Sequence, residues 1–358
     1  MPDRQLTCLI AAGGTAGHVL PSLAVAEALS ARGVRVTFAG SPDRVEARLV
    51  PEAGFAFDPF RVAGLPRRPG LAFVRTVVRA AGAVRASGRI LASRRPDIVL
   101  GGGGYVAGPM VLAAARRRLP AALLEADAEL GLANRLAAPF ARRVFLSFPI
   151  EGRDAAKYRV TGRPIPARSR PPTRAEGRRR FDLPTSGRVL LVFGGSLGAR
   201  ALNELAVERF GAAGPVVLHL AGERDYESLR PRVTRDDYRL LPFTDDFGAA
   251  LAAADLVLAR AGGSVWELAA AGRPAVLVPY PHATADHQTK NARYFERAGG
   301  AVVVPERELS SVPALVEGLL DDAARLEAMA KAMLAVARPN AADEIAEELI
   351  AMAQAPPA

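Results

Sequence analysis

Cysteine and tryptophan are almost missing from this sequence, which contains one of each in 358 residues. The single cysteine, Cys8, excludes an internal disulfide, and its position inside an apolar run predicts a buried thiol and a reducing cytoplasm. No stretch approaches the roughly eighteen uninterrupted apolar residues of a membrane-spanning helix. The first residues also lack the basic segment, apolar core and cleavage site of an export signal. We therefore expect a chain that is neither exported nor integral to a membrane.

Acidic residues are scarce relative to arginine. The formal net charge is +10, and nearly all of the 47 basic residues are arginines. Residues 61–95 contain no Asp or Glu, and apolar residues alternate there with Arg61, Arg67, Arg68, Arg75, Arg79, Arg85, Arg89, Arg94 and Arg95. Phe73 is the only aromatic residue of this stretch, so the stacking residues of a nucleic-acid site are missing. The pattern favours a surface resting on anionic lipid over a solvated helix face.

Short apolar runs alternate with longer helical patterns along the chain. Most runs are continuous, which predicts strands buried on both faces, as in a parallel sheet. The ten predicted strands are residues 6–12, 34–40, 97–101, 121–125, 143–148, 189–194, 216–222, 256–260, 275–280 and 301–305. The predicted fold class is therefore α/β.

The sequence also repeats itself. The stretch "LIAAGGTAGHVLPSLAVAEAL" has a counterpart in "LLVFGGSLGARALNELAV", and "PDIVLGGGGYVAGPMVLAA" has one in "ADLVLARAGGSVWELAAAG". The length exceeds that of one ordinary core. The proline- and arginine-rich segment 161–180 is typical of a linker, so we expect two similar domains that divide near residue 160.

The first glycine-rich turn, Gly13–Gly17, stands between a predicted strand and a helix. Such a turn brings backbone N–H groups close to a phosphate, but it matches neither the dinucleotide fingerprint nor a P-loop. His18 lies at the start of the helix, whose positive end opposes an imidazolium. A neutral histidine there can accept a proton, and the alternative is a histidine that caps the turn or binds phosphate.

Six blocks of sequence resemble the MurG family, the membrane-associated N-acetylglucosaminyltransferases of peptidoglycan synthesis. They are "GGTAGHVLPSLAVAEAL", "SPDRVEARLVPEAGF", "DIVLGGGGYVAGPMVLAA", "VFGGSLGARALNE", "ELAAAGRPAVLVP" and "HATADHQTKNA". The resemblance implies a GT-B glycosyltransferase with two Rossmann-like domains whose parallel sheets face a central cleft. It implies inverting transfer of N-acetylglucosamine from UDP-GlcNAc to the C4 hydroxyl of undecaprenyl-diphospho-N-acetylmuramoyl-pentapeptide, which converts lipid I to lipid II.

The same resemblance assigns a role to each half. Residues 1–160, joined by a returning helix at 336–358, would bind lipid I and dock on the cytoplasmic face of the cell membrane. Residues 161–335 would bind UDP-GlcNAc. The implied partners are UDP-GlcNAc, lipid I, an anionic membrane surface and other cell-wall synthesis and division proteins. No metal, other cofactor or nucleic acid is implied, because helix N-termini and arginine balance a diphosphate.

The resemblance also assigns site residues. His18 would be the catalytic base, with Glu125 as the next candidate, and Glu267 would accept the ribose hydroxyls of UDP. In the first half, substrate contacts are implied for Gly14, Thr15, Ala16, Gly17, Tyr105, Asp127, Asn134 and Arg163. In the second half they are implied for Ser196, Asn203, Thr244, Arg260, Gly262, Gly263, Ser264, Glu267, Gln288 and Asn291. Helix caps or solvated positions are the alternatives for Asn203, Asn291 and Glu267.

Several positions depart from the family pattern. Where the family commonly has His-Glu-Gln-Asn, residues 124–127 read Leu-Glu-Ala-Asp. Arg163 stands where the family favours asparagine, and Pro166 where it often has arginine. Three other functions fit the same halves: a GT-B enzyme acting on another lipid acceptor, a UDP-GlcNAc 2-epimerase, and a non-catalytic sugar-nucleotide-binding protein.

Overall fold

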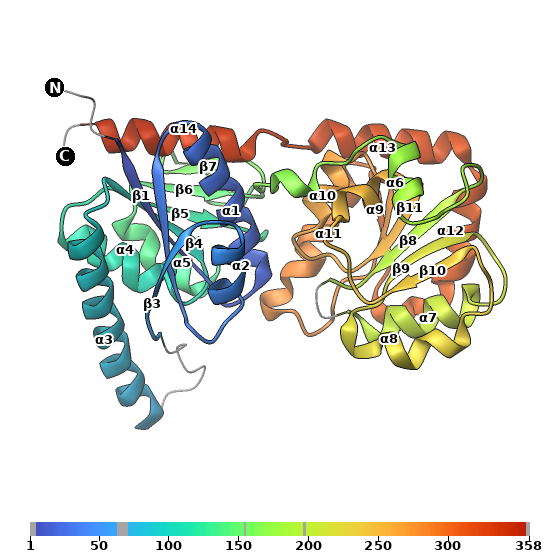
Figure 1. Cartoon of the computed structure of the whole chain (residues 1–358), viewed down its shortest axis with the longest axis horizontal. Helices are drawn as coiled ribbons and strands as arrows, with labels where there is room; N and C mark the ends of the chain where they lie inside the picture. The colour runs from blue at the N-terminus through green and yellow to red at the C-terminus, as the bar shows by residue number, and fades with distance from the viewer. Residues whose placement is uncertain (1–4, 63–70, 154, 196–197, 356–358) are drawn as a thin grey trace. The chain divides into compact units, whose positions relative to one another are not determined.

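The computed structural model describes residues 5–62, 71–153, 155–195 and 198–355, with only the backbone described over 71–80. The chain forms two compact units (Figure 1). The first unit combines Met1–Pro166 with Pro339–Ala358, and the second is Ala167–Arg338. The division follows Pro166, a few residues beyond the boundary expected near residue 160. Ser196, Arg67 and Arg68 lie outside the described residues, as do the side chains of Arg75 and Arg79.

The described part of the first unit contains a seven-stranded parallel sheet in the order β3-β2-β1-β4-β5-β6-β7. Its strands are β1 (Thr7–Ala12), β2 (Arg35–Gly40), β3 (Ala56–Pro59), β4 (Ile98–Gly103), β5 (Ala121–Glu125), β6 (Arg143–Leu146) and β7 (Tyr158–Val160). Its helices are α1 (Ala16–Ala31), α2 (Glu46–Glu52), α3 (Leu71–Arg94), α4 (Ala107–Arg116), α5 (Leu132–Ala137) and α14 (Ala341–Gln354).

The described part of the second unit contains a six-stranded parallel sheet in the order β10-β9-β8-β11-β12-β13. Its strands are β8 (Val189–Phe193), β9 (Val216–Leu220), β10 (Tyr238–Leu241), β11 (Leu256–Ala259), β12 (Ala275–Leu277) and β13 (Ala301–Val303). Its helices are α6 (Arg174–Arg180), α7 (Arg200–Phe210), α8 (Glu223–Leu229), α9 (Phe247–Ala253), α10 (Val265–Ala270), α11 (His287–Arg297), α12 (Val312–Asp321) and α13 (Ala323–Val336).

All ten predicted strands are present, and the α/β fold class is confirmed. The pattern missed β3, β7 and β10, each of which lies at an edge of its sheet. These strands are short and largely exposed or half-buried, so they lack the continuous apolar run that burial on both faces produces.

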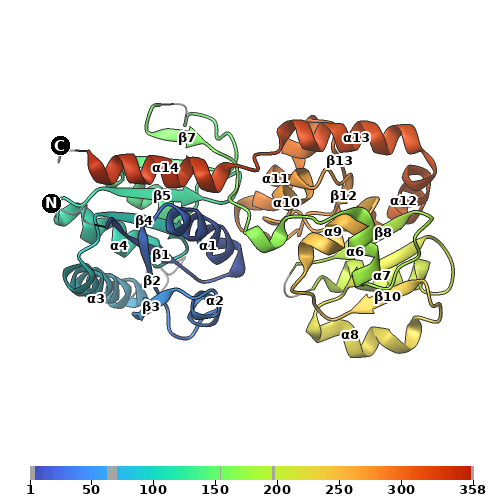
Figure 2. The ribbon, with the colours of Figure 1, turned by 45° about the horizontal axis from the view of Figure 1, so that its top comes forward.

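The pleat of β1 divides the core of the first unit between the two faces of its sheet. Cys8 and Ile10 point into a cluster built with α1 and α14, whereas Leu9 and Ala11 point into a cluster built with α3, α4 and α5. Because both sets of side chains are buried, helices are required on both faces, as Figure 2 shows.

Helix α14 returns the chain to the first unit and lies along α1 (Figures 1 and 2). Ile345 and Leu349 are fully buried in the same apolar cluster as Leu29 of α1. On the outer side, Arg32 donates to Asp343 at 2.8 Å and to Glu347 at 2.9 Å. Apolar burial supplies most of this docking energy, because half-exposed ion pairs contribute little.

The only tryptophan of the chain, Trp266, lies in the core of the second unit. It packs edge-on against Phe295 of α11, with ring centroids 5.3 Å apart. Its burial makes its fluorescence a reporter of this unit, just as the buried Cys8 thiol reports on the first. No helix in the described part of the chain is long and apolar enough to cross a bilayer.

Removing the Leu349 side chain tests the docking of α14. We expect Leu349→Ala to lower the free energy of unfolding of the first unit by about 2 to 4 kcal/mol, because contacts are lost and a cavity remains. Burial raises the pKa of Cys8 to about 12, so its thiol is unreactive until the unit opens. In Leu349→Ala, Cys8 labelling should therefore begin at a lower urea concentration than in the parent protein, while the midpoint of the Trp266 fluorescence transition stays unchanged.

Glu347→Ala on the same helix is the control. This change removes an exposed carboxylate paired with Arg32 and should cost less than about 1 kcal/mol. If Leu349→Ala shifts the Trp266 transition as much as Cys8 labelling, or shifts neither, α14 does not stabilise the first unit independently.

Candidate functional site

The turn between β1 and α1 lies at the carboxyl edge of the first sheet. Gly14 has φ +93°, a left-handed conformation that favours glycine, and Thr15 returns to the extended region before α1 begins at Ala16. Gly14, Thr15 and Gly17 are exposed and Ala16 is half-buried. Since the first N–H groups of a helix have no intrahelical partner, this edge offers donors to a ligand, as the sequence predicts.

His18 follows this turn on the first turn of α1 and is half-buried. Its Nδ1 lies 3.3 Å from the Thr15 hydroxyl. Burial lowers the pKa of His18 below its ordinary value, the nearby Asp127 carboxylate opposes that shift, and the Arg163 guanidinium adds to it. The imidazole is therefore mainly neutral near pH 7 and able to accept a proton.

A run of four glycines, Gly101–Gly104, forms the surface against which this turn rests. The pairing of β1 with β4 shifts register between Ala11 and Ala12, which leaves an irregularity beside the turn. A Cβ on Gly103 would lie 2.6 Å from His18 Cδ2, and one on Gly104 would lie 2.1 Å from the Gly13 carbonyl oxygen. The sequence pattern gave these glycines no separate role, yet any side chain at either would displace the turn.

Glu125, at the end of β5, is buried and bonded within its own loop. One carboxylate oxygen accepts from Gly131 N and from Asn134 Nδ2, both at 2.9 Å, and the other accepts from Asp127 N at 3.2 Å. Burial raises the pKa of Glu125, although these three donors oppose the shift. Asn134 is buried and also donates to Leu124 O, whereas Tyr105 is 58% exposed. Glu125 and Asn134 thus hold the loop that follows β5.

Arg163 is buried at the same edge. Its guanidinium donates to Gly17 O at 2.5 Å and to Ala126 O at 3.2 Å. The substrate contact that the resemblance implies for Arg163 stays a prediction; in the structure its guanidinium bonds to these two loop carbonyls. Asp127 and Arg163 both act electrostatically on His18, so the structure brings these three predicted residues together.

The matching turn of the second unit follows β8 and contains Gly195, with φ +96°, and Gly198, with φ +72°. Asn203 of α7 is fully buried beneath it. Its side chain donates to Ala221 O at 2.8 Å and to Asp225 Oδ2 at 3.0 Å. A Cβ on Gly198 would lie 2.3 Å from that same Ala221 carbonyl oxygen. Asn203 is therefore not a helix cap; it fixes the segment on which the turn rests.

His219 extends this buried network. Its Nε2 lies 3.0 Å from Asn203 Oδ1, and its Nδ1 lies 2.8 Å from the Tyr238 hydroxyl. Complete burial lowers the pKa of His219 to about 3. The sequence pattern did not single out this histidine, because it stands inside an apolar strand where only its buried partners distinguish it.

Arg260, after β11, bonds to neighbouring groups of the protein. It donates to Val278 O and Pro279 O, each at 3.2 Å, forms an ion pair with Glu306, and lies over the Tyr280 ring at 5.5 Å. These contacts hold the chain after β12. The substrate contact that the resemblance implies for Arg260 stays a prediction.

The second glycine turn of this unit leads into α10. Gly262, Gly263 and Ser264 are half-buried, and a Cβ on Gly262 would meet no atom within 4 Å. Glu267 lies in the first turn of α10 and is half-buried. Asn291 of α11 is fully buried and donates to Ala261 O at 3.2 Å. Glu267 thus lies beside an open turn that Asn291 supports from below.

Two further predicted residues lie on nearby loops. Gln288 is half-buried, and its Oε1 accepts from Tyr280 N at 2.9 Å. The hydroxyl of Thr244 accepts from Asp246 N at 3.1 Å, next to Phe243, which is 54% exposed. Within the described part of the chain, no three His, Cys, Asp or Glu side chains gather as a metal site.

Comparison with protein families defines the class of protein. The N-terminal domain of glycosyltransferase family 28 matches residues 8–146, and the C-terminal domain of that family matches residues 189–347. Together with the two parallel-sheet units and their glycine turns, these matches make the chain a glycosyltransferase with two nucleotide-binding-like domains.

Within this class, the chain belongs to the MurG family. It is 40% identical to the Salinibacter ruber UDP-N-acetylglucosamine--N-acetylmuramyl-(pentapeptide) pyrophosphoryl-undecaprenol N-acetylglucosamine transferase, over 99% of this chain and 98% of that one. A protein of the same name from Halorhodospira halophila is 43% identical over 95% and 96% of the two chains. The crystal structure of Acinetobacter baumannii MurG superposes with a TM-score of 0.76 at 29% identity, covering 97% of this chain and all of that one.

A UDP-N-acetylglucosamine 2-epimerase shares the fold alone. It superposes with a TM-score of 0.61 at 16% identity and covers 97% of this chain and 96% of that one. The epimerase considered from the sequence is therefore a fold relative, whereas family membership rests on the glycosyltransferases.

The buried His219 predicts how the stability of the second unit depends on pH. The unfolded imidazole takes up a proton near its ordinary pKa of 6.5, whereas the folded one resists protonation down to about pH 3. Stability that is present above pH 6.5 is therefore lost as the pH falls. Between pH 6.5 and about pH 5, above the range of the carboxylates, we expect a loss of about 2 kcal/mol.

Urea unfolding, monitored by Trp266 fluorescence at several pH values, measures the slope of unfolding free energy against pH. His219→Gln should flatten it, while His282→Gln, at an exposed histidine of the same unit, should leave it unchanged. A slope that survives in His219→Gln would assign the proton uptake to another group.

Proposed function

We propose that this chain transfers N-acetylglucosamine from UDP-GlcNAc to the C4 hydroxyl of undecaprenyl-diphospho-N-acetylmuramoyl-pentapeptide, with inversion at the anomeric carbon. The first unit binds the lipid-linked acceptor and the second unit binds the donor. Relatives whose names specify this transfer match nearly the whole chain, which supports the assignment. Release of UDP completes the reaction.

One observation carries the mechanism: a half-buried, mainly neutral histidine stands at the exposed turn of the acceptor unit. As the C4 oxygen attacks the anomeric carbon, the bond from that carbon to UDP breaks and UDP leaves with the electron pair. The hydroxyl proton must pass to a base at the same time. His18 serves as that base, and its lowered pKa keeps it unprotonated at neutral pH.

Glu125 has a supporting role in this proposal. Its two oxygens already accept three hydrogen bonds from its own loop, so few lone pairs remain for a substrate hydroxyl. It fixes the loop after β5 with Asn134. The acceptor surface is provided by the exposed residues Gly14, Thr15, Gly17 and Tyr105 and by the half-buried Ala16.

The proposed donor contacts divide into half-buried groups that meet the ligand and buried groups that support them. Glu267 accepts the two ribose hydroxyls, since a carboxylate offers two adjacent acceptor oxygens. Gln288 contacts the sugar, and the backbone near Thr244 pairs with uracil. Asn203, Asn291 and Arg260 act from beneath, because their side chains bond to loop groups of the protein itself.

No metal or other cofactor is needed in this proposal. The first N–H groups of α1 and α7 carry partial positive charge at the sheet edges, and such groups stabilise the phosphates of acceptor and donor. Ser264 and the glycine turn before α10 add further backbone donors to the donor phosphates.

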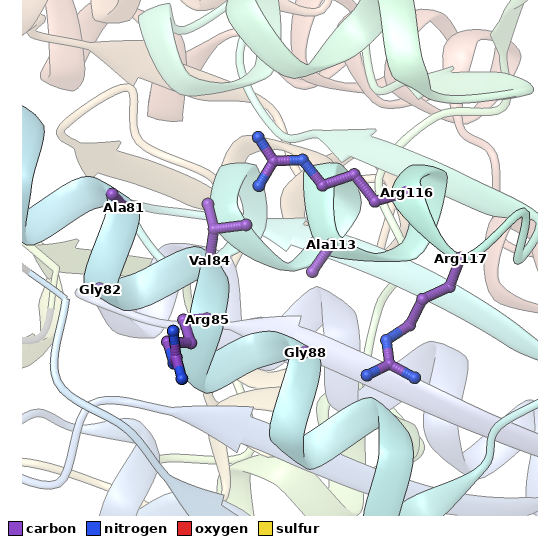
Figure 3. A pocket seen from close by; sticks show the side chains of 8 residues that line it. All are labelled: Ala81, Gly82, Val84, Arg85, Gly88, Ala113, Arg116 and Arg117. Atoms are coloured by element: carbon purple, nitrogen blue, oxygen red, sulfur yellow. The ribbon is translucent and has the colours of Figure 1, made fainter.

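We place the membrane contact on the face formed by α3 and α4. Arg85 of α3, Arg116 of α4 and Arg117 border a groove of about 480 Å³ (Figure 3). The rest of its lining is apolar or small: Ala81, Gly82, Val84, Gly88 and Ala113. Guanidinium groups around an apolar floor suit lipid phosphates and the chain segments next to them, so the protein docks peripherally on the cytoplasmic face. Cell-wall synthesis and division proteins are further proposed partners.

His18→Ala tests the proposed chemistry. We expect kcat to fall by about 10²- to 10⁴-fold, because a positioned proton acceptor is lost, with little change in UDP-GlcNAc affinity. The acidic limb of the pH profile, which lies below the ordinary histidine pKa because burial lowers the pKa of His18, should disappear. Transfer of labelled N-acetylglucosamine to a soluble lipid I analogue provides the measurement.

Glu267→Ala is the matched variant in the other unit. It should weaken UDP binding by about 1.5 to 3 kcal/mol in calorimetry and leave the acidic limb in place. If His18→Ala keeps kcat within a few fold of the parent, His18 is a structural or phosphate-contacting residue and Glu125 becomes the candidate base.

Replacing Arg85, Arg116 and Arg117 by glutamine tests the membrane contact. We expect binding to anionic vesicles to weaken by about 1 kcal/mol per charge, and parent binding to decline steeply with salt. Sedimentation with vesicles containing phosphatidylglycerol measures the partitioning. The charge-matched control carries Arg209→Gln, Arg230→Gln and Arg297→Gln at exposed positions of the second unit. Equal losses in both triple variants would show that net charge, rather than this face, governs binding.

A further inference from the structure

Glu46, on α2, is a fully buried carboxylate behind the turn that carries His18. Its Oε2 accepts from Gly14 N at 3.0 Å, and its Oε1 accepts from Ser41 N at 3.0 Å. Gly14 belongs to the turn after β1, and Ser41 follows the neighbouring strand β2. One side chain therefore ties together two loops at the carboxyl edge of the sheet.

Two glycines provide the room for this carboxylate. A Cβ on Gly13 would lie 2.2 Å from Glu46 Oε1, and a Cβ on Gly40 would lie 2.7 Å from Glu46 Cγ. Gly13 does not have a positive φ, so its backbone does not itself demand glycine. The need for glycine at position 13 arises from Glu46.

Arg163 holds the other end of the same turn. Its guanidinium donates to Gly17 O and to Ala126 O, which belongs to the loop after β5. This residue stands where the MurG family favours asparagine. The turn is thus tied to β2 at Gly14 through a buried anion and to β5 at Gly17 through a buried cation, and His18 follows directly.

These contacts determine which backbone groups can meet a ligand. The N–H of Gly14 is used by Glu46, and a negative charge lies directly behind it. A phosphate must therefore bind through the donors at residues 15–17, closer to the start of α1 and to His18. The sequence pattern treated the whole turn as one set of donors.

We propose that Glu46 and Arg163 are positioning residues of the transfer site, which fix the turn between them so that the His18 imidazole meets the acceptor hydroxyl. The proposal rests on the proposed function of His18 as the base. Neither residue contacts the reacting atoms; each acts through the backbone of the turn.

The charges of the two residues also give opposite signatures at His18. Three charged groups from neighbouring elements influence this imidazole: Asp127 after β5, Glu46 of α2 and Arg163. Glu46 and Asp127 raise the pKa of His18, and Arg163 lowers it. Removing Glu46 should move the acidic limb of the kcat profile to lower pH, and removing Arg163 should move it to higher pH.

The first experiment is a double-mutant cycle that does not depend on activity. Gly13→Ala should lower the unfolding midpoint of the first unit by several degrees, because the new methyl group meets the Glu46 carboxylate. In a Glu46→Ala background that space is open, so the same change should cost less than half as much. Cys8 labelling during a thermal ramp reports the midpoint. Equal shifts in the two backgrounds would overturn the placement of Glu46.

The second experiment measures transfer. Glu46→Gln puts an amide NH₂ against a backbone N–H, and we expect kcat to fall at least about tenfold, while UDP affinity and the KM for UDP-GlcNAc stay within about twofold. Glu52→Gln, on the exposed side of the same helix, is the control and should match the parent. A kcat for Glu46→Gln that equals the control contradicts the positioning role.

Two variants of Arg163 distinguish the effect of its charge on the His18 pKa from the effect of its hydrogen bonds on the turn. Arg163→Gln should lower kcat and shift the acidic limb to higher pH. Arg163→Lys keeps the charge but loses the fork that reaches two carbonyls, so it should lower kcat without shifting the limb. The proposal would be overturned if the acidic limb of the kcat profile moved in the same direction for Glu46→Gln and Arg163→Gln.

Failure of the base assignment is distinguishable from failure of this proposal. If His18→Ala keeps its acidic limb, the base assignment fails, and the double-mutant cycle of Gly13 and Glu46 still decides the placement of Glu46.

Discussion

A tight packing contact in the first unit joins the β1–α1 turn to the glycines that end β4, and it restricts where the turn can lie. The Gly13 carbonyl and the His18 ring occupy the space that side chains at positions 104 and 103 would fill. Strand β1 lies beside β4 in the sheet, which brings the turn after β1 against the glycines that end β4. The direction of His18, and with it the proposed proton transfer, follows from this backbone-to-backbone packing.

Buried polar side chains hold the loops at the edges of both sheets. Glu46, Glu125 and Arg163 bond to loop groups in the first unit, and Asn203, Asn291 and Arg260 do so in the second. In a medium of low dielectric constant, such satisfied bonds fix a single loop conformation, whereas a missing partner is costly. The loop backbone, together with half-buried side chains such as His18 and Glu267, forms the surface that we propose meets the substrates.

The arginine content serves two physical purposes. Some guanidinium groups pair within the second unit, where the buried Arg178 and the exposed Arg174 and Arg188 contact the buried Asp255. Others remain exposed, as at the groove between α3 and α4. The net charge of the chain favours an anionic partner, and the exposed arginines of this groove make its face the contact that we propose.

The α/β class, ten of the strands, the two glycine turns and the family were predictable from the amino-acid sequence, whereas the order of the strands within each sheet came from the structure. Each of the predictable features follows from local patterns: continuous apolar runs, glycines at strand ends and motif order. Edge strands such as β3 were missed, because exposed strands carry little apolar pattern. The return of the C-terminal helix to the first unit, which the family resemblance implied, is present as α14. The folded structure was needed to show that Asn203 and Arg163 bond to protein groups and that Glu46 lies behind Gly14. Those contacts join residues far apart in the chain, and hydrogen-bond partners of buried polar groups are chosen by packing, which no local pattern records.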